Sequence, residues 1–216
     1  MAIKLIIFDL DGTLINSIED ITNALNHAFG PYGVNDLTAT EVTAMIGEGP
    51  SKLIQDVLTE RNLVADKEML VARFLDYYES HPADKTVLYP GTREMLETLK
   101  DLKMAVVTNK TEELSRKVLE KFELDTYFGM VVAIDTIVER KPSPVPVMHV
   151  LSAFKVAPEN AIIVGDSTID IQTGKASSVR TVAVTHGYGR NGFQEGADFV
   201  IGNLLELIDI VKHENG

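Results

Sequence analysis

Residues 3–13 read IKLIIFDLDGT, and this stretch decides the fold. A mostly apolar run ends at Phe8 and leads directly into Asp9 and Asp11, which are followed by Gly12 and Thr13. Two carboxylates this close repel each other, so a nearby cation or proton must offset their charge. An Asp-Gly pair is also typical of a hairpin turn, but residues 13–25 continue with helical spacing, so we expect no returning strand.

The composition limits the classes of function. The chain has 216 residues, of which 45% are apolar, with no cysteine and a net charge of -12. This length predicts one or two domains, and the composition is typical of a soluble globular protein. The negative charge argues against nucleic acid or an anionic membrane as a partner. No apolar run is long enough for a membrane span or a signal peptide, so we expect a cytoplasmic protein.

Strand-like runs rich in Ile and Val alternate with segments of helical spacing along most of the chain. The predicted strands lie at residues 4–8, 104–108, 130–134, 161–164, 181–184 and 198–201. This alternation predicts an α/β fold, a Rossmann-like parallel sheet covered on both faces. Residues 15–85 break the rhythm, because we find only helical patterns there, at 17–29, 40–45, 50–60 and 66–80. We therefore expect an α/β core of residues 1–14 and 86–216 with an inserted helical domain at 15–85.

Polar residues follow four of the predicted strands. They are Asp9 and Asp11, then Thr108, Asn109 and Lys110, then Lys141, and finally Asp166 and Asp170. Taken alone, Lys141-Pro142 is typical of an exposed linker and Gly165-Asp166-Ser167 of a helix cap. However, parallel strands present their carboxyl ends at one edge of the sheet, where ligands bind. The coincidence of all four sets at this edge favours a functional site.

Four carboxylates at one sheet edge could not all stay ionised unless a cation lay among them. The candidate ligands are all oxygen atoms, which favours Mg²⁺. A Mg²⁺ ion combined with an ammonium group and a hydroxyl-amide pair is typical of a phosphate-binding site.

Four motifs carry a resemblance to a known family. DLDGT (9–13), VVTNK (106–110), RKPSP (140–144) and GDSTID (165–170) occur in the order and spacing of the haloacid dehalogenase-like superfamily. The helical insert resembles the cap domain of that superfamily. Within it, the chain is most similar to the phosphoglycolate phosphatase branch, on the evidence of FDLDGTLINS, MIGEGPSKLI and VTHGYG. The resemblance covers nearly the whole chain and implies a phosphatase.

The resemblance also implies roles for the two aspartates of the first motif. Asp9 would be the nucleophile that forms an aspartyl-phosphate. Asp11 would be the general acid that protonates the leaving oxygen and then the general base that activates water. Mg²⁺ would be bound by a carboxylate oxygen of Asp9, the backbone carbonyl of Asp11 and Asp166, with phosphate and water completing the octahedron.

The other motifs would hold the substrate. Thr108 and Asn109 would bind the phosphoryl oxygens, and Lys141 would neutralise charge there. Asp170 would lie behind the metal ligands and orient a bound water or Lys141.

Selectivity is expected to come from the cap domain, where Gly47 and Glu48 are the candidate substrate-binding residues. The favoured substrate is 2-phosphoglycolate, a small phosphorylated metabolite. Glu48 would repel its carboxylate unless it points to solvent or pairs with Lys52. A plain turn between two helices explains the same residues equally well.

Several alternatives stay open at this point. The four motifs are also compatible with a β-phosphoglucomutase or a pyrophosphatase, and with a phosphonatase if Lys52 formed a Schiff base. A dehalogenase gives Asp11 nothing to protonate. A phospho-acceptor signalling domain is shorter, lacks the insert and places its acidic pair before the phosphorylated aspartate. A non-catalytic sensor that kept the fold has no support, because every reacting group is present. The chain is expected to be a monomer or a homodimer.

Overall fold

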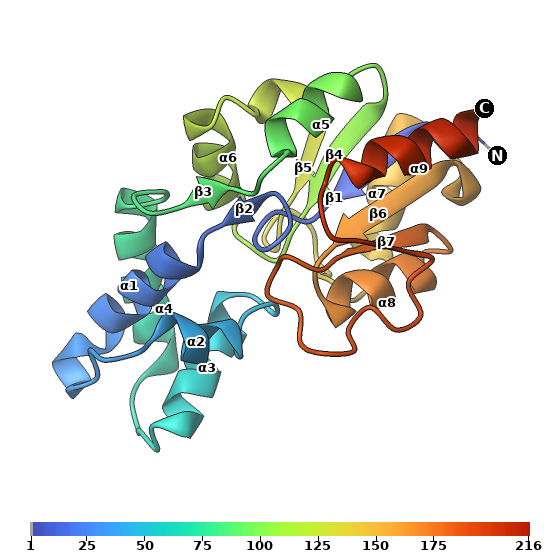
Figure 1. Ribbon diagram of the computed structural model, residues 1–216. Coiled ribbons are helices and arrows are strands. Elements are labelled where there is room, and N and C mark those ends of the chain that lie inside the picture. Colours follow the sequence, from blue (N-terminus) through green and yellow to red (C-terminus); the bar gives the residue numbers. More distant parts are fainter. Residues whose placement is uncertain (1) are drawn as a thin grey trace. The chain divides into compact units, whose positions relative to one another are not determined.

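The computed structural model describes residues 2–216, which divide into two compact units (Figure 1). The α/β unit consists of Met1–Asn16 and Leu88–Gly216, and the helical unit is Ser17–Val87. No helix in residues 2–216 combines the length and the apolar character that crossing a membrane requires.

A six-stranded sheet forms the centre of the α/β unit. Its order is β5-β4-β1-β6-β7-β8, and every neighbouring pair is parallel. The strands are β1 (Leu5–Phe8), β4 (Lys103–Val107), β5 (Met130–Val132), β6 (Ala161–Gly165), β7 (Arg180–Val184) and β8 (Phe199–Ile201). The predicted α/β fold is confirmed, and each predicted strand lies within two residues of an observed one.

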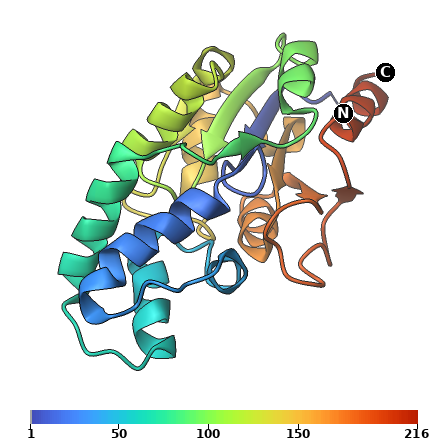
Figure 2. The same ribbon diagram turned by 60° about the vertical axis from the view of Figure 1, so that its left-hand side comes forward.

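Helices cover both faces of this sheet, as Figures 1 and 2 show. They are α5 (Thr92–Thr98), α6 (Glu112–Lys121), α7 (Val145–Phe154), α8 (Thr168–Ala176) and α9 (Glu206–Asn215). On β1, Leu5 and Ile7 pack in the same cluster as Val147 and Val150 of α7. Side chains alternate along a strand, so Ile6 and Phe8 face the opposite side, where they are equally buried. Burial on both faces explains the unbroken apolar sequence of β1.

The register of the sheet fixes where the polar residues emerge. Phe8, the last residue of β1, lies opposite Val106 of β4 on one side and Val164 of β6 on the other. The chain runs from β1 outward to β4 and β5 and then returns to β6 on the other side of β1, so the switch point of the topology lies between β1 and β6. The segments after β1, β4 and β6 therefore start level with one another.

The helical unit contains four α-helices: α1 (Ile18–Phe29), α2 (Ala39–Thr43), α3 (Pro50–Glu60) and α4 (Lys67–Ser80). A short 3₁₀ turn at Gly30–Tyr32 follows α1, and Gly33 ends it with a φ of +79°. The side chains of Thr38 and Glu41 form a capping box at the start of α2, and Asp66 caps α4. Helix α4 packs against both α1 and α3.

Short extended segments connect the units. The sequence pattern predicted no strand in residues 15–85, and this was wrong for Ile15–Asn16, which form β2 and pair with β3 (Val87–Leu88) in a two-stranded sheet. Two residues are too few to show an alternating pattern. Inside the helical unit, the buried carboxylate of Asp20 accepts hydrogen bonds from the backbone N–H groups of Lys85 and Thr86, and from Thr86 Oγ1 at 2.6 Å.

Candidate active site

Three carboxylates meet at the carboxyl edge of the sheet. Asp9 follows β1, whereas Asp166 and Asp170 follow β6, and each offers an oxygen that lies within 4.8 Å of the others. The Asp9 N–H donates to Val164 O at 2.9 Å, which extends the pairing of β1 with β6 to the site itself. The cluster is poorly solvated, because only 2% of Asp166 and 1% of Asp170 is exposed.

One buried ammonium group lies among these carboxylates. Lys141 Nζ, from the loop between β5 and α7, is 2.8 Å from Asp9 Oδ1 and 2.6 Å from Asp170 Oδ1. The second oxygen of Asp170 accepts hydrogen bonds from the N–H and the hydroxyl group of Ser167, which caps α8. Asp170 therefore connects the start of a helix to the lysine.

Burial and mutual repulsion shift the pKa values of the ionisable groups in this cluster. Burial raises the pKa of Asp9 to about 7; the Lys141 ammonium opposes this shift and the Asp170 charge adds to it. Burial, together with the charges of Asp170 and Asp9, raises the pKa of Asp166 well above its usual range. Burial lowers the pKa of Lys141, but the two carboxylates beside it outweigh this effect and raise it overall. The cluster is thus suited to bind a divalent cation, which would relieve the repulsion.

Asp11 lies outside this cluster and pairs with a different lysine from the one that contacts Asp9 and Asp170. Lys110 Nζ, at the exit of β4, is 3.1 Å from Asp11 Oδ1 and 3.2 Å from Asp11 Oδ2. The sequence interpretation noted Lys110 among the polar residues at the sheet edge and gave it no role. The spacing of the motif could not show which carboxylate it pairs with.

The two residues before Lys110 also reach the sheet edge and are buried. Thr108 Oγ1 accepts a hydrogen bond from the Lys110 N–H at 3.2 Å, and Asn109 Nδ2 donates to the backbone oxygen of Lys141 at 3.1 Å. The structure therefore brings Thr108, Asn109 and Lys141 together at one place. Their contact with a phosphoryl group stays a prediction.

Asp166 is held by residues that the sequence interpretation missed. Thr13 Oγ1 donates to Asp166 Oδ1 at 2.9 Å, and the Tyr188 N–H donates to Asp166 Oδ2 at 2.7 Å. A Cβ atom on Gly12 would overlap the Asp166 carboxylate, and a Cβ on Gly187 would overlap both that carboxylate and Gly12 O. Gly187 and Tyr188 belong to the segment VTHGYG, which was used only as evidence of family resemblance and not to predict a contact with Asp166.

Gly47 and Glu48 belong to the helical unit, between α2 and α3. Gly47 has a φ of +132° and Gly49 a φ of +88°, values that favour glycine. Lys52 forms an ion pair with Asp56 one turn along α3, and 41% of its side chain is exposed. This pairing agrees with the interpretation of Lys52 as a solvated helix residue. The role of Gly47 and Glu48 in substrate binding stays a prediction.

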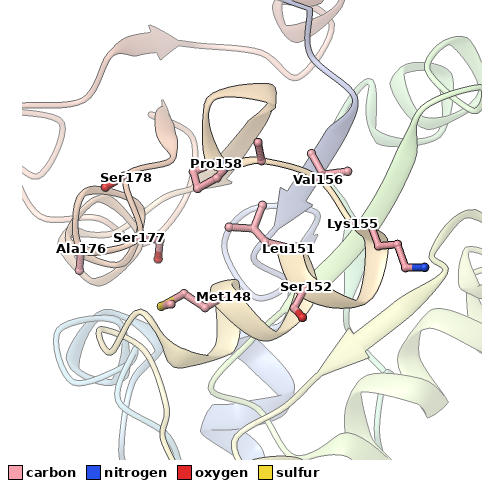
Figure 3. Close-up of a pocket in the computed structure, with 10 residues that line it drawn as sticks. Met148, Leu151, Ser152, Lys155, Val156, Pro158, Ala176, Ser177 and Ser178 are labelled. Carbon is pink, nitrogen blue, oxygen red and sulfur yellow. The ribbon is translucent and has the colours of Figure 1, made fainter.

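A groove elsewhere in the α/β unit lacks the chemistry of this site (Figure 3). It is lined by Met148, Leu151, Ser152, Lys155, Val156, Ala157, Pro158, Ala176, Ser177 and Ser178. Residues 155–158 and 176–178 precede β6 and β7, so the groove lies at the amino ends of these strands. Lys155 is its one charged residue. The carboxylate cluster, at the opposite edge, is the better candidate active site.

Comparison with known proteins identifies the family. A model of the haloacid dehalogenase-like hydrolases matches residues 6–184. This chain belongs to that family. The resemblance inferred from the four motifs is therefore confirmed, and the family's catalytic carboxylates can be sought at the sheet edge described above.

Full-length relatives narrow the class of enzyme. The chain is 35% identical to a phosphoglycolate phosphatase of Chromobacterium violaceum, over 98% of this chain and 97% of that protein. It is 37% identical to a phosphoglycolate phosphatase of Aquifex aeolicus, over 97% of each. The crystal structure of a predicted phosphoglycolate phosphatase from Haemophilus somnus superimposes with a TM-score of 0.91 at 29% identity, covering 96% of this chain and 97% of that one. The protein is a phosphatase.

Proposed function

We propose that this phosphatase hydrolyses a small phosphomonoester through an aspartyl-phosphate on Asp9, with Mg²⁺ as cofactor and 2-phosphoglycolate as the first candidate substrate. The observation that carries the proposal is the position of the Asp9 carboxylate, which follows the central strand and lies 2.8 Å from the Lys141 ammonium. Support for the substrate comes from the relatives of matching length, which are phosphoglycolate phosphatases.

The reaction has two steps. First, a carboxylate oxygen of Asp9 bonds to phosphorus while the bond to the ester oxygen breaks, and Asp11 gives that oxygen a proton. Next, water bonds to phosphorus while the bond to Asp9 breaks, and Asp11 takes a proton from this water. Inorganic phosphate leaves, and both aspartates return to their starting states. Lys141 favours the ionised form of Asp9 that attack requires.

Asp9, the backbone carbonyl of Asp11 and Asp166 are the residues that would hold Mg²⁺. The ion would balance the charge of the cluster and polarise the phosphoryl group. The residues present fit this cation, because all the donors are oxygen atoms and the pKa values of Asp9 and Asp166 are raised without it. Asp170 would act indirectly, by orienting Lys141 or a bound water.

Substrate binding is assigned to two groups of residues. Thr108 and Asn109 would donate hydrogen bonds to the phosphoryl oxygens, and Lys141 would neutralise their charge. We assign the helical unit the role of a cap that selects the substrate through backbone groups near Gly47 and Glu48. Glycine at position 47 would let the backbone approach a small ligand closely.

Acid-quench trapping tests the mechanism. With Mg²⁺ and substrate, the wild-type protein should gain the mass of one phosphoryl group, and Asp9→Asn should gain none and turn over at least 10³-fold more slowly, on the order expected for loss of a nucleophile. Asp36→Asn is the matched control, because 74% of the Asp36 side chain is exposed. An Asp9→Asn variant with a wild-type rate would refute the nucleophile assignment.

A substrate panel tests the second part of the proposal. The values of kcat/KM should be compared for 2-phosphoglycolate, pyrophosphate, β-glucose 1-phosphate, phosphonoacetaldehyde, nucleoside monophosphates and sugar phosphates. We expect 2-phosphoglycolate to rank first. If several other compounds exceed it by more than about tenfold, roughly 1.4 kcal/mol in transition-state binding, the substrate assignment fails while the phosphatase remains.

A further inference from the structure

Lys110 and Asp11 form a buried ion pair beside the proposed nucleophile. Only 4% of the Lys110 side chain and 15% of the Asp11 side chain is exposed. The parallel pairing of β1 with β4 brings Lys110 and Asp11 together. Phe8 and Val106 lie opposite each other, and Asp11 and Lys110 follow them a few residues later. This ammonium group is distinct from Lys141, which contacts Asp9 and Asp170.

Hydrogen bonds fix both backbone polar groups of Lys110. Its N–H donates to Thr108 Oγ1 at 3.2 Å, and its carbonyl accepts from the Ile134 N–H at 3.1 Å. The ammonium nitrogen lies almost equally far from the two Asp11 oxygens, at 3.1 and 3.2 Å. A cation shared in this way restrains rotation of the carboxyl group about its Cβ–Cγ bond.

Stability alone is a weak reason for such a pair. Removing an ammonium and a carboxylate from water costs about as much as their attraction returns, so a buried ion pair adds little net stability. A fixed carboxyl orientation, in contrast, is valuable to a group that must give up a proton and later accept one, because proton transfer requires the donor within hydrogen-bond reach of the reacting oxygen.

We propose that Lys110 is a positioning residue that fixes the Asp11 carboxyl group for both of its proton transfers. This inference rests on the proposed function, in which Asp11 is the general acid and base. In the first step Asp11 is protonated and Lys110 holds its other oxygen, and the ester oxygen takes the proton as the bond to phosphorus breaks. In the second step water passes a proton to Asp11. Lys110 keeps its own protons throughout and touches neither reacting oxygen.

A role through Asp11 predicts a dependence on the leaving group. An alkoxide needs a proton as it departs, whereas nitrophenolate is a stable anion and leaves without one. Lys110→Met should therefore slow phosphorylation of Asp9 by the best alkyl phosphate substrate at least tenfold, a part of the 10²- to 10⁴-fold that general acid catalysis typically contributes. With p-nitrophenyl phosphate the loss should stay within about threefold, and KM for both substrates should change by less than about threefold. Acid-quenched single-turnover measurements give these rates.

Two further variants control for a change in structure. Lys110→Arg keeps a cation beside Asp11 and should recover most of the loss on the alkyl phosphate. Lys110→Gln replaces Lys110→Met in every comparison if the latter does not fold. In each folded variant, the increase in melting temperature caused by Mg²⁺ should match that of the wild type, because Lys110 is not part of the carboxylate cluster.

A double-mutant cycle with Asp11→Asn decides the matter. If Lys110 acts only through Asp11, the double variant should be no more than about twofold slower than Asp11→Asn alone. Equal losses on both substrates, or a loss from Lys110→Met that persists beside Asp11→Asn, would overturn the inference. If Asp11→Asn itself slows both substrates equally, the acid role of Asp11 in the proposed function is wrong instead, so the two failures are distinguishable.

Discussion

The carboxylate cluster predicts that the affinity for Mg²⁺ depends strongly on pH. Burial, partly opposed by Lys141 and reinforced by Asp170, raises the pKa of Asp9 from 3.8 to about 7. Between these two values the folded protein holds more protons than the unfolded chain, so the stability of the metal-free protein falls as pH rises through this window. Below about pH 7, Asp9 is mostly protonated, so a metal ion that binds its ionised form must displace this proton.

The size of the effect follows from the shift. At pH 5, well below the pKa of about 7, Asp9 is almost wholly protonated and Mg²⁺ must displace its proton, so the apparent affinity for Mg²⁺ should be on the order of 100-fold weaker than at pH 7.5. Because the pKa of Asp166 is raised as well, this residue adds to the difference. The stabilisation by a fixed concentration of Mg²⁺ should therefore grow from pH 5 to pH 7.5.

Melting temperatures measured against Mg²⁺ concentration at pH 5 and pH 7.5 give the Mg²⁺ concentration at the midpoint of each binding curve. Isothermal titration calorimetry in buffers of different ionisation enthalpy counts the protons released on binding. We expect at least one proton per Mg²⁺ at pH 5. Asp9→Asn should reduce both the proton release and the pH dependence, because it removes one titrating ligand. Midpoints within about threefold of each other at pH 5 and pH 7.5, or binding without proton release, would refute the reasoning.

Two other predictions concern close contacts inside each unit. Gly187→Ala should weaken Mg²⁺ binding at least tenfold by calorimetry, because its methyl group would displace Asp166, whereas Gly30→Ala, with open space around its Cβ position, should bind Mg²⁺ as the wild type does. Asp20→Ala should lower the free energy of unfolding by about 2–4 kcal/mol in urea titrations, because it leaves the buried N–H and hydroxyl of Thr86 without their acceptor. Asp20→Asn, which retains one acceptor oxygen, should lose less. An unchanged urea midpoint for Asp20→Ala would contradict this account.

The sequence was sufficient to predict the sheet, because a parallel strand buried on both faces needs a continuous apolar run. The residues of β1 and β6 form such runs, and polar residues follow each at once. The same rule predicts that Asp9 and Asp166 lie at one edge of the sheet. The helices of the helical unit were also predicted from helical spacing: α1, α3 and α4 lie within a residue of the predicted ranges 17–29, 50–60 and 66–80, whereas α2 (Ala39–Thr43) begins and ends earlier than the predicted 40–45.

Two kinds of contact could not be predicted in this way: those made by backbone groups, and the choice of partner among several charged residues that are far apart in the sequence. Every residue except proline has the N–H group that Tyr188 donates to Asp166, so the side chain at position 188 does not reveal the contact. Lys110 could have paired with any of four carboxylates at the sheet edge, and only the register and loop geometry select Asp11. Strand β2 was missed because a two-residue strand shows no period.

The two points at which the chain leaves and re-enters the α/β unit are neighbours. Leu14 O accepts hydrogen bonds from the Tyr89 N–H at 3.1 Å and from Thr92 Oγ1 at 3.1 Å. Within the helical unit, Asp20 likewise ties the first helix to the returning segment at Lys85 and Thr86. In each unit, hydrogen bonds thus join the segments at which the chain enters and leaves it. The helical unit, Ser17–Val87, is a single insertion in the chain of the α/β unit. An insertion with neighbouring ends can change in length or sequence without moving the strands that carry the carboxylate cluster.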